Sequence, residues 1–207
     1  ATELKNELNR IIGHTEYIED ILNATRRWAH DRRFQVGVQR LRNLTTSSES
    51  AIDYSSIAET ALECMFTPVA NEFIAKHGNI TGGEMAFIAL GKLGSREMTA
   101  SSDLDLIIIY RAQKDGTVSN GERPLSINQY FARLSQRQIN ALTALTQEGG
   151  LFEVDMRLRP LGKSGPIASR YSSFSTYYKE QAWAWEHMAL TRARVIFATS
   201  NIFRLDI

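Results

Sequence analysis

The spacing of apolar residues changes at the Thr-Gly-Gly sequence at residues 81–83. Before this point, apolar residues recur every three or four positions, which is the period of an amphipathic helix. After it they form unbroken runs of strand length, at Met85–Leu90 and within Asp103–Tyr110, and the second run is rich in β-branched residues. The pattern therefore predicts an α+β fold in which a helical segment precedes a small sheet.

The first part of the chain is predicted to be helical throughout. One helical region covers residues 1–43, and a second follows the polar linker at residues 45–50 and ends at Gly78, a residue suited to a helix C-cap. We accordingly divide the chain into a helical N-terminal segment, residues 1–79, and a catalytic core, residues 80–207.

The core is expected to contain three short strands and two longer helices. An amphipathic helix is predicted over Ile127–Gln147, capped by Gly149-Gly150. A third strand is predicted over Leu151–Arg159, and a final helix from about Ser172 to Ala198. These elements complete a small sheet with flanking helices.

The composition limits the classes of partner. The chain has 24 Lys and Arg residues against 23 Asp and Glu residues, a formal charge of +1. Nucleic acids and anionic membranes are normally recognised by uncompensated basic residues, so neither is an expected partner. The apolar runs are far shorter than a membrane span of roughly 20 residues, and the N-terminal residues lack the apolar part of a signal peptide. The single cysteine, Cys64, cannot form an intrachain disulfide, which favours a reducing cytoplasm. The chain starts without methionine and is expected to be a fragment of a longer protein.

Asp103 and Asp105 are two residues apart at the start of the second apolar run. In a strand their carboxylates project from the same face, with Cβ atoms roughly 7 Å apart. Two acids this close raise each other's pKa, and a divalent cation between them removes the repulsion. Mg²⁺ suits such a pair because it prefers oxygen ligands and retains water and phosphate. The alternative is a turn residue followed by a solvent-facing acid at a strand edge, the more frequent meaning of an isolated Asp-x-Asp.

Two further features favour a metal site. Gly94-Ser95 follows a buried strand, and a Gly-Ser turn that opens a short helix presents backbone N–H groups to a phosphate chain. Acidic and basic residues alternate along the third predicted strand and so share one face: Glu153, Asp155, Arg157 and Arg159. An exposed face of salt-bridged charges is the alternative for that strand. Together the features give a phosphate-binding turn, two acids on one strand, a third acid on another, and neighbouring guanidinium groups.

This set of features resembles the nucleotidyltransferase superfamily typified by DNA polymerase β. In that superfamily a Gly-Ser motif, an Asp-x-Asp strand and a third acidic strand hold two Mg²⁺ ions around a nucleoside triphosphate. Two such ions about 4 Å apart would bind both the attacking and the leaving oxygen of an in-line displacement at phosphorus. The resemblance implies a polymerase β-like core, with a small mixed sheet and flanking helices, after the helical segment.

Three separated motifs narrow the resemblance: GKLGSREMTASSDLDLIIIY (91–110), EVDMRLRPLGKSGPIAS (153–169) and AWAWEHMALTRARV (182–195). They occur in this order in the glutamine synthetase adenylyltransferase family, and the resemblance covers roughly residues 31–197. It implies a set of catalytic metal ligands: Asp103, Asp105 and Asp155. It also implies a set of residues that bind ATP or neutralise its phosphates: Lys92, Gly94, Ser95, Ser102, Arg157 and Arg159.

The activity implied by this resemblance is the transfer of AMP from ATP to a tyrosine hydroxyl of glutamine synthetase, with release of pyrophosphate, to regulate nitrogen assimilation in the cytoplasm. The family's enzyme has two homologous halves, and AWAWEHMALTRAR is similar to the C-terminal, adenylylating half. Two alternatives stay open: phosphorolytic removal of AMP from glutamine synthetase, and a module that binds nucleotide or partner without turnover. A PII-type signal protein and glutamine are expected to act on the full-length enzyme through other segments.

Overall fold

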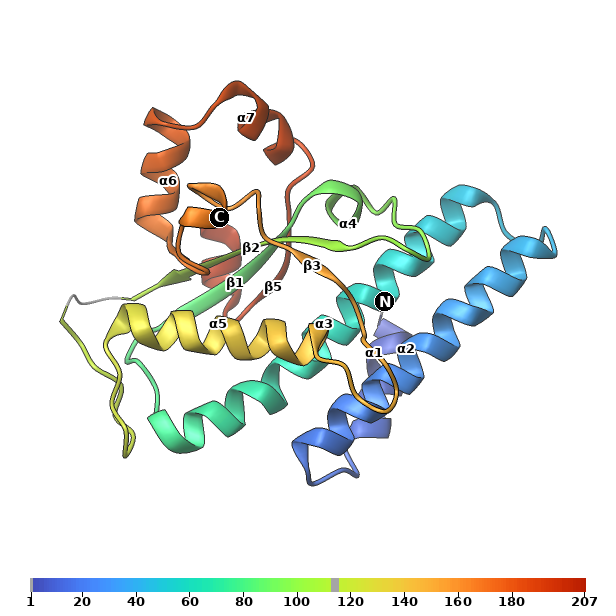
Figure 1. The fold of residues 1–207 in the computed structure, drawn as a ribbon, viewed down its shortest axis with the longest axis horizontal. Helices are drawn as coiled ribbons and strands as arrows, with labels where there is room; N and C mark the ends of the chain where they lie inside the picture. Colours follow the sequence, from blue (N-terminus) through green and yellow to red (C-terminus); the bar gives the residue numbers. More distant parts are fainter. Residues whose placement is uncertain (1, 113–115) are drawn as a thin grey trace.

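The computed structural model describes residues 2–112 and 116–207. Its first part consists of three helices: α1 (Thr2–Ile12), α2 (Ile18–Leu41) and α3 (Ser47–His77). The long helices α2 and α3 pack side by side (Figure 1). The predicted helical segment is confirmed, except that the region expected to be one helix over residues 1–43 is broken after Ile12, where Gly13 disfavours helix.

Local signals define both ends of α3. At its start, the Thr46 hydroxyl accepts a hydrogen bond from the Glu49 backbone N–H, and the Glu49 carboxylate accepts one from the Thr46 backbone. At its end, Gly78 takes a φ of 69°, which favours glycine, and caps the helix as predicted. The chain therefore leaves the helical segment at a fixed point and enters the sheet.

The sheet has five strands in the described part of the chain: β1 (Glu84–Ala89), β2 (Leu104–Arg111), β3 (Val154–Asp155), β4 (Ser169–Arg170) and β5 (Arg194–Ala198). The order is β3-β2-β1-β5, and β4 also pairs with β2. The β1–β2 and β1–β5 pairs are antiparallel, whereas β3 and β4 run parallel to β2. The α+β class with a small mixed sheet is confirmed.

The C-terminal part differs from its prediction. The prediction of a single helix from about Ser172 to Ala198 is wrong. The chain instead forms α6 (Tyr171–Glu180), α7 (Ala184–Leu190) and β5, followed by α8 (Asn201–Asp206). The Val-Ile-Phe sequence inside β5 is typical of strands and pairs with β1. If this segment were helical, the edge of β1 opposite β2 would lack the strand that pairs with it in the structure.

The third strand and the preceding helix are both shorter than predicted. β3 covers only Val154–Asp155, because Arg157 folds back to donate its backbone N–H to the Asp155 carboxylate. The helix α5 (Ile127–Thr143) is confirmed, but Gly149-Gly150 does not cap it. Its C-terminal carbonyls instead accept hydrogen bonds from the buried Arg26.

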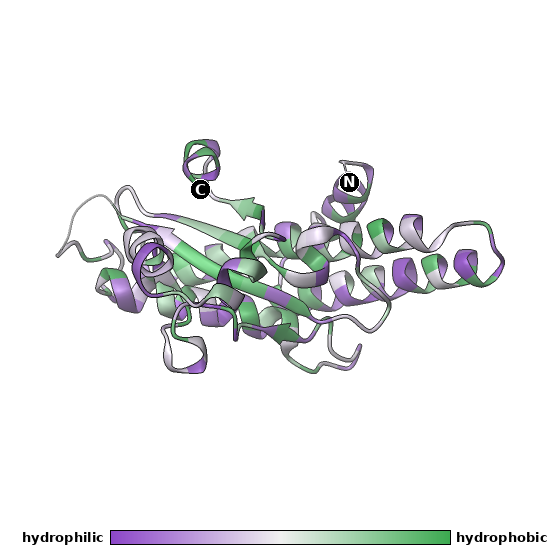
Figure 2. Cartoon of the chain, turned by 90° about the horizontal axis from the view of Figure 1, so that it is seen from above, coloured by the Kyte–Doolittle hydropathy of each residue, from purple (hydrophilic) through white to green (hydrophobic). Residues whose placement is uncertain are grey.

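The central strands are apolar without interruption because both faces of the sheet are covered. Alternate residues of β1 belong to two different hydrophobic clusters: Met85, Phe87 and Ala89 to one, Ala86 and Ile88 to the other. The first cluster includes residues of α3 and α5, and the second includes residues of α6, α7 and α8 (Figure 1). Figure 2 shows the resulting apolar sheet between more polar helices.

The first of these clusters extends beyond the predicted domain boundary. It runs from Leu8 in α1 to Ile196 in β5, so the helical segment contributes side chains to the packing under the sheet. The division at residues 79 and 80 stays a prediction about folding units. Among the described residues, no helix has both the length and the continuous apolar character of a membrane span.

The single thiol provides a probe of unfolding. Cys64 lies in α3 with 6% of its surface exposed, and burial raises its pKa to about 11. The reactive species is the thiolate, so at pH 8 we expect native Cys64 to react with a thiol reagent at least about a hundredfold more slowly than the unfolded chain. Timed labelling at rising urea concentrations checks this. Labelling of the native protein at the unfolded rate would contradict the buried placement.

Candidate metal and nucleotide site

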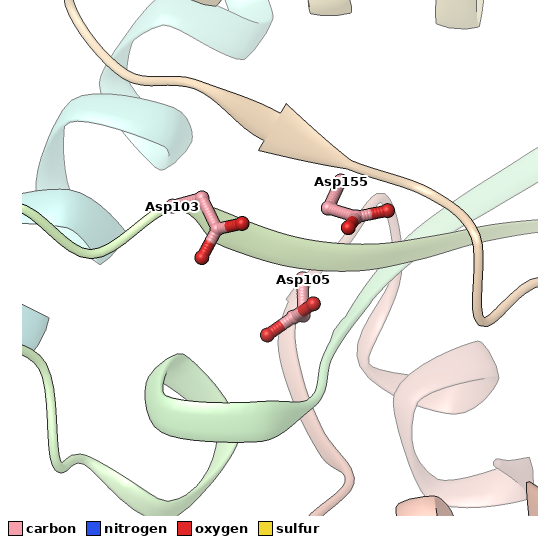
Figure 3. A group of neighbouring side chains, drawn as sticks. All are labelled: Asp103, Asp105 and Asp155. Carbon is pink, nitrogen blue, oxygen red and sulfur yellow. The ribbon is translucent and has the colours of Figure 1, made fainter.

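Three carboxylates meet at the start of β2, where β3 pairs with it. Asp103 and Asp105 lie on either side of the buried Leu104, and the parallel pairing of the two strands sets Asp105 opposite Asp155. One oxygen from each carboxylate lies within 4.8 Å of those of the other two. Figure 3 shows the three side chains gathered beside the strands. The structure thus brings together the three predicted metal ligands.

The surroundings push the pKa values of two of these acids in opposite directions. Burial raises the pKa of Asp105, and the charges of Asp103 and Asp155 raise it further. Hydrogen bonds from Arg157 lower the pKa of Asp155, whose carboxylate accepts from the Arg157 backbone N–H at 2.8 Å and from its Nε at 2.6 Å. Ionisation is therefore less favourable for Asp105 than for Asp155.

A divalent cation fits this donor set. The cluster offers carboxylate oxygens from three residues, which are the hard ligands that Mg²⁺ prefers. A cation bound among them would offset the repulsion that raises the pKa of Asp105. The chemistry of the cluster thus agrees with the metal predicted from the sequence.

Gly91 lies against the cluster, although the sequence pattern did not single it out. It has a φ of 50°, and a Cβ atom there would overlap the Asp105 carboxylate. Only glycine meets both conditions. The sequence signal that could have identified Gly91 is its position after the buried strand β1. The backbone there closely approaches the Asp105 side chain on the neighbouring strand, which requires a residue without a side chain.

The Gly-Ser turn is placed differently from its prediction. The short helix α4 (Gly91–Ser95) begins at Gly91, so Gly94 and Ser95 end the helix rather than open it. The Gly94 N–H donates to the Leu90 carbonyl at 2.8 Å. The Ser95 hydroxyl lies 3.0 Å from the Gly91 carbonyl and 2.7 Å from the Glu97 carboxylate. The N–H groups without helical acceptors are those of the first turn, nearer to Asp105.

Two of the three predicted cationic residues lie near the acids, and the third binds backbone carbonyls of a loop. Arg157 pairs with Asp155, and the charge of the exposed Lys92 acts on Asp105 to lower its pKa. The Arg159 guanidinium instead donates to the carbonyls of Met156 and Lys163 at 2.8 and 3.1 Å, and to that of Gly165. Arg159 therefore closes the loop that follows β3, which was predicted to continue as a strand.

Ser102 directly precedes the acid pair and organises its approach. Its hydroxyl accepts a hydrogen bond from the Thr99 backbone N–H at 2.9 Å. A cleft of about 700 Å³ opens beside Asp103 and Asp155, with Arg157 and Lys163 also on its walls. A cleft of this size accommodates a nucleotide.

A cluster of three acids at the start of a buried strand, beside a short helix and basic side chains, is the arrangement expected of a nucleotidyltransferase-type domain. Residues 1–204 match the family model described as glutamate-ammonia ligase adenylyltransferase. The chain belongs to this family, which confirms the resemblance of its three motifs.

Several relatives carry the printed name bifunctional glutamine synthetase adenylyltransferase/adenylyl-removing enzyme. The chain is 43% identical to that of Bartonella henselae over 195 residues, which cover 94% of this chain and 20% of the relative. It is 44% identical to that of a Bradyrhizobium species over 205 residues, 99% of this chain and 21% of the relative. The chain thus spans about a fifth of the length of these relatives.

Proposed function

We propose that this chain transfers AMP from ATP to a tyrosine hydroxyl of glutamine synthetase and releases pyrophosphate. The observation that carries the proposal is the cluster of Asp103, Asp105 and Asp155 in a chain of the adenylyltransferase family. The cluster, the mixed sheet and the short helix α4 also support a polymerase β-like core. A binding module without turnover would be expected to lose at least one of the three acids, because their mutual repulsion is unfavourable.

In this proposal Asp103, Asp105 and Asp155 hold one or two Mg²⁺ ions. Such ions, when bound, neutralise triphosphate charge and favour in-line displacement at the α-phosphorus. Lys92 and Arg157 lie beside the acids and would neutralise further phosphate charge. The first turn of α4 would meet the phosphate chain, with Gly94 and Ser95 fixing the end of that helix.

The tyrosine hydroxyl has an ordinary pKa near 10 and must lose its proton during attack. Asp155 is a candidate for the base as well as for a metal ligand, because it lies at the cluster. The hydrogen bonds from Arg157 lower its pKa, which makes it a weaker proton acceptor and a better anionic ligand. We therefore assign Asp155 the ligand role.

A second activity is suggested by the name of the relatives, which includes an adenylyl-removing function. In that reaction phosphate would attack the adenylylated tyrosine and release ADP. The similarity of AWAWEHMALTRAR (182–194) to the adenylylating half of the family favours AMP transfer for this chain. Control of the full-length enzyme by glutamine and a PII-type protein stays part of the same proposal.

The test offers the protein two substrates in parallel with Mg²⁺. One reaction contains unmodified glutamine synthetase and ATP labelled in its α-phosphate, and the other contains adenylylated glutamine synthetase and inorganic phosphate. Label on glutamine synthetase in the first reaction is the expected result. Release of ADP in the second reaction alone would assign the removing activity instead, and absence of both reactions would overturn the proposal.

A further inference from the structure

The side chain of Arg194 connects three elements around α4. It stands at the start of β5, where its backbone pairs with Ala89 of β1. Its Nε donates to the Gly94 carbonyl at 3.1 Å, and its Nη2 donates to the Leu93 carbonyl at 2.8 Å. These carbonyls belong to the last turn of α4, where a short helix supplies few N–H donors; the Leu93 carbonyl also accepts from the Arg96 backbone N–H at 3.3 Å.

The same guanidinium is fixed from the other side by α3. Arg194 forms an ion pair with Glu59, whose side chain is only 16% exposed. Glu59 also pairs with Arg96, the residue that caps α4, at 3.3 Å. The end of α4 is thus tied to α3 through one carboxylate and two arginines.

The backbone packing leaves α4 little room at this end. A Cβ atom at Gly94 would overlap the Arg192 carbonyl, so α4 lies directly against the segment that leads into β5. At its other end, Gly91 lies directly against the Asp105 carboxylate. Because α4 has five residues, a length of roughly 7.5 Å, a shift at Gly94 moves Gly91 and Lys92 as well.

We infer that Arg194 is a positioning residue that fixes α4, and with it Gly91 and Lys92, at a set distance from the acid cluster. The inference rests on the proposed function, in which α4 meets the phosphates of ATP. Arg194 makes its contacts to α4 and Glu59 and acts on the reaction through them. A displacement of about 1 Å in such an element is enough to slow a reaction by around a hundredfold.

The test compares Arg194→Gln with wild type. Arg194→Gln removes the charge that pairs with Glu59 and the two-armed contact with the carbonyls. We expect kcat/KM for ATP to fall by roughly 10- to 100-fold. The affinity for Mg²⁺ in the absence of nucleotide, measured from the thermal shift that the ion causes, should stay within about twofold of wild type. The reason is that the acids lie on β2 and β3 and not on α4. Arg192→Gln is the matched control, since among the described residues this neighbour's side chain forms an exposed ion pair with Glu97 at 3.9 Å, and it should behave as wild type.

A second variant separates positioning from folding. Arg194→Ala creates a space that free guanidinium can enter, so millimolar guanidinium chloride, well below denaturing concentrations, should restore at least a few-fold of the lost activity. Arg194→Lys keeps the charge but cannot bridge two carbonyls and Glu59 together, and should fall between wild type and Arg194→Gln.

Each outcome bears on one statement. Unchanged kcat/KM in Arg194→Gln overturns the inference, as does a loss of Mg²⁺ binding equal to the loss of activity, or an Arg194→Ala variant that guanidinium does not improve. If the wild-type chain binds ATP with Mg²⁺ but transfers no AMP, the proposed function fails, and the inference is judged on nucleotide affinity alone. Equal affinity of wild type and Arg194→Gln would then overturn it.

Discussion

Replacement of Asp105 with asparagine is expected to abolish AMP transfer to glutamine synthetase, a loss of at least about 10³-fold in kcat/KM. Asparagine keeps the shape of the side chain but removes one of the three charges that would hold the cation. Asp103→Asn should have an effect of the same order, because its carboxylate belongs to the same cluster. The measurement is transfer of label from α-phosphate-labelled ATP to glutamine synthetase.

The fold of the Asp105→Asn variant should survive, and the pKa of Asp105 gives the sign of the stability change. Its folded pKa is raised above the ordinary value of 3.8. In the metal-free protein, the stability that it contributes is present below pH 3.8 and is lost as pH rises through the raised pKa. At neutral pH asparagine removes this unfavourable charge, so the variant should unfold in urea with EDTA at the same or a higher concentration than wild type.

A matched control distinguishes the loss of AMP transfer in Asp105→Asn from a general effect of removing a carboxylate. Asp31 is exposed on α2, and Asp31→Asn should leave both transfer and Mg²⁺ binding unchanged. Mg²⁺ should raise the melting temperature of wild type and of Asp31→Asn, but not that of Asp105→Asn. Full activity in either Asp103→Asn or Asp105→Asn would refute the site assignment.

Replacement of Arg26 with alanine is the substitution expected to cost most stability. Arg26 is fully buried in α2, and its guanidinium donates to four carbonyls, at distances from 2.8 to 3.1 Å: those of Leu22, Ala141, Ala144 and Gly149. Burial lowers its pKa, yet the Ala141 and Ala144 carbonyls at the end of α5 favour the cation. Alanine leaves a cavity and several buried acceptors without donors, so we expect the free energy of unfolding to fall by roughly 3–5 kcal/mol.

The neighbouring residue supplies the control for Arg26→Ala. Arg27 forms an exposed ion pair with Glu148, and the Arg27 side chain is 57% exposed. Glu148 lies in the same segment whose carbonyls accept hydrogen bonds from Arg26. Arg27→Ala should cost less than about 1 kcal/mol. Urea unfolding of both variants measures the difference. Equal costs for the two substitutions would show that the buried hydrogen bonds contribute little.

The parts of the fold that were predictable are those whose signal lies in adjacent residues. β1 and β2 are buried on both faces, so each is a continuous apolar run, and Gly78 marks the end of α3. β5 has a shorter apolar run, Val195–Ala198, and its assignment as a strand depends on pairing with β1, about 100 positions away in the sequence. The final helix was therefore predicted where the sheet needed a strand.

The candidate site divides in the same way. Residue type and spacing suffice to select Asp103 and Asp105, and the family motif adds Asp155. The roles of Gly91 and Arg194 depend on how α4 packs between β2 and β5, and no local pattern carries that information. The family resemblance implies a phosphate role for Arg159, on a strand face shared with Asp155, but the chain turns after β3 and the Arg159 guanidinium donates to loop carbonyls instead.

The parallel pairing of β2 with β3 also has a consequence for the order of events during synthesis. Asp155 follows Asp105 by about fifty residues, so a growing chain that has already released β1 and β2 carries only two of the three acids. At roughly 5–20 residues per second, the ribosome adds the third acid about 2.5–10 s later. A nascent chain thus gains its complete acid cluster only once β3 has been made, and a cation bound there would stabilise the paired strands β1, β2 and β3 rather than an earlier intermediate.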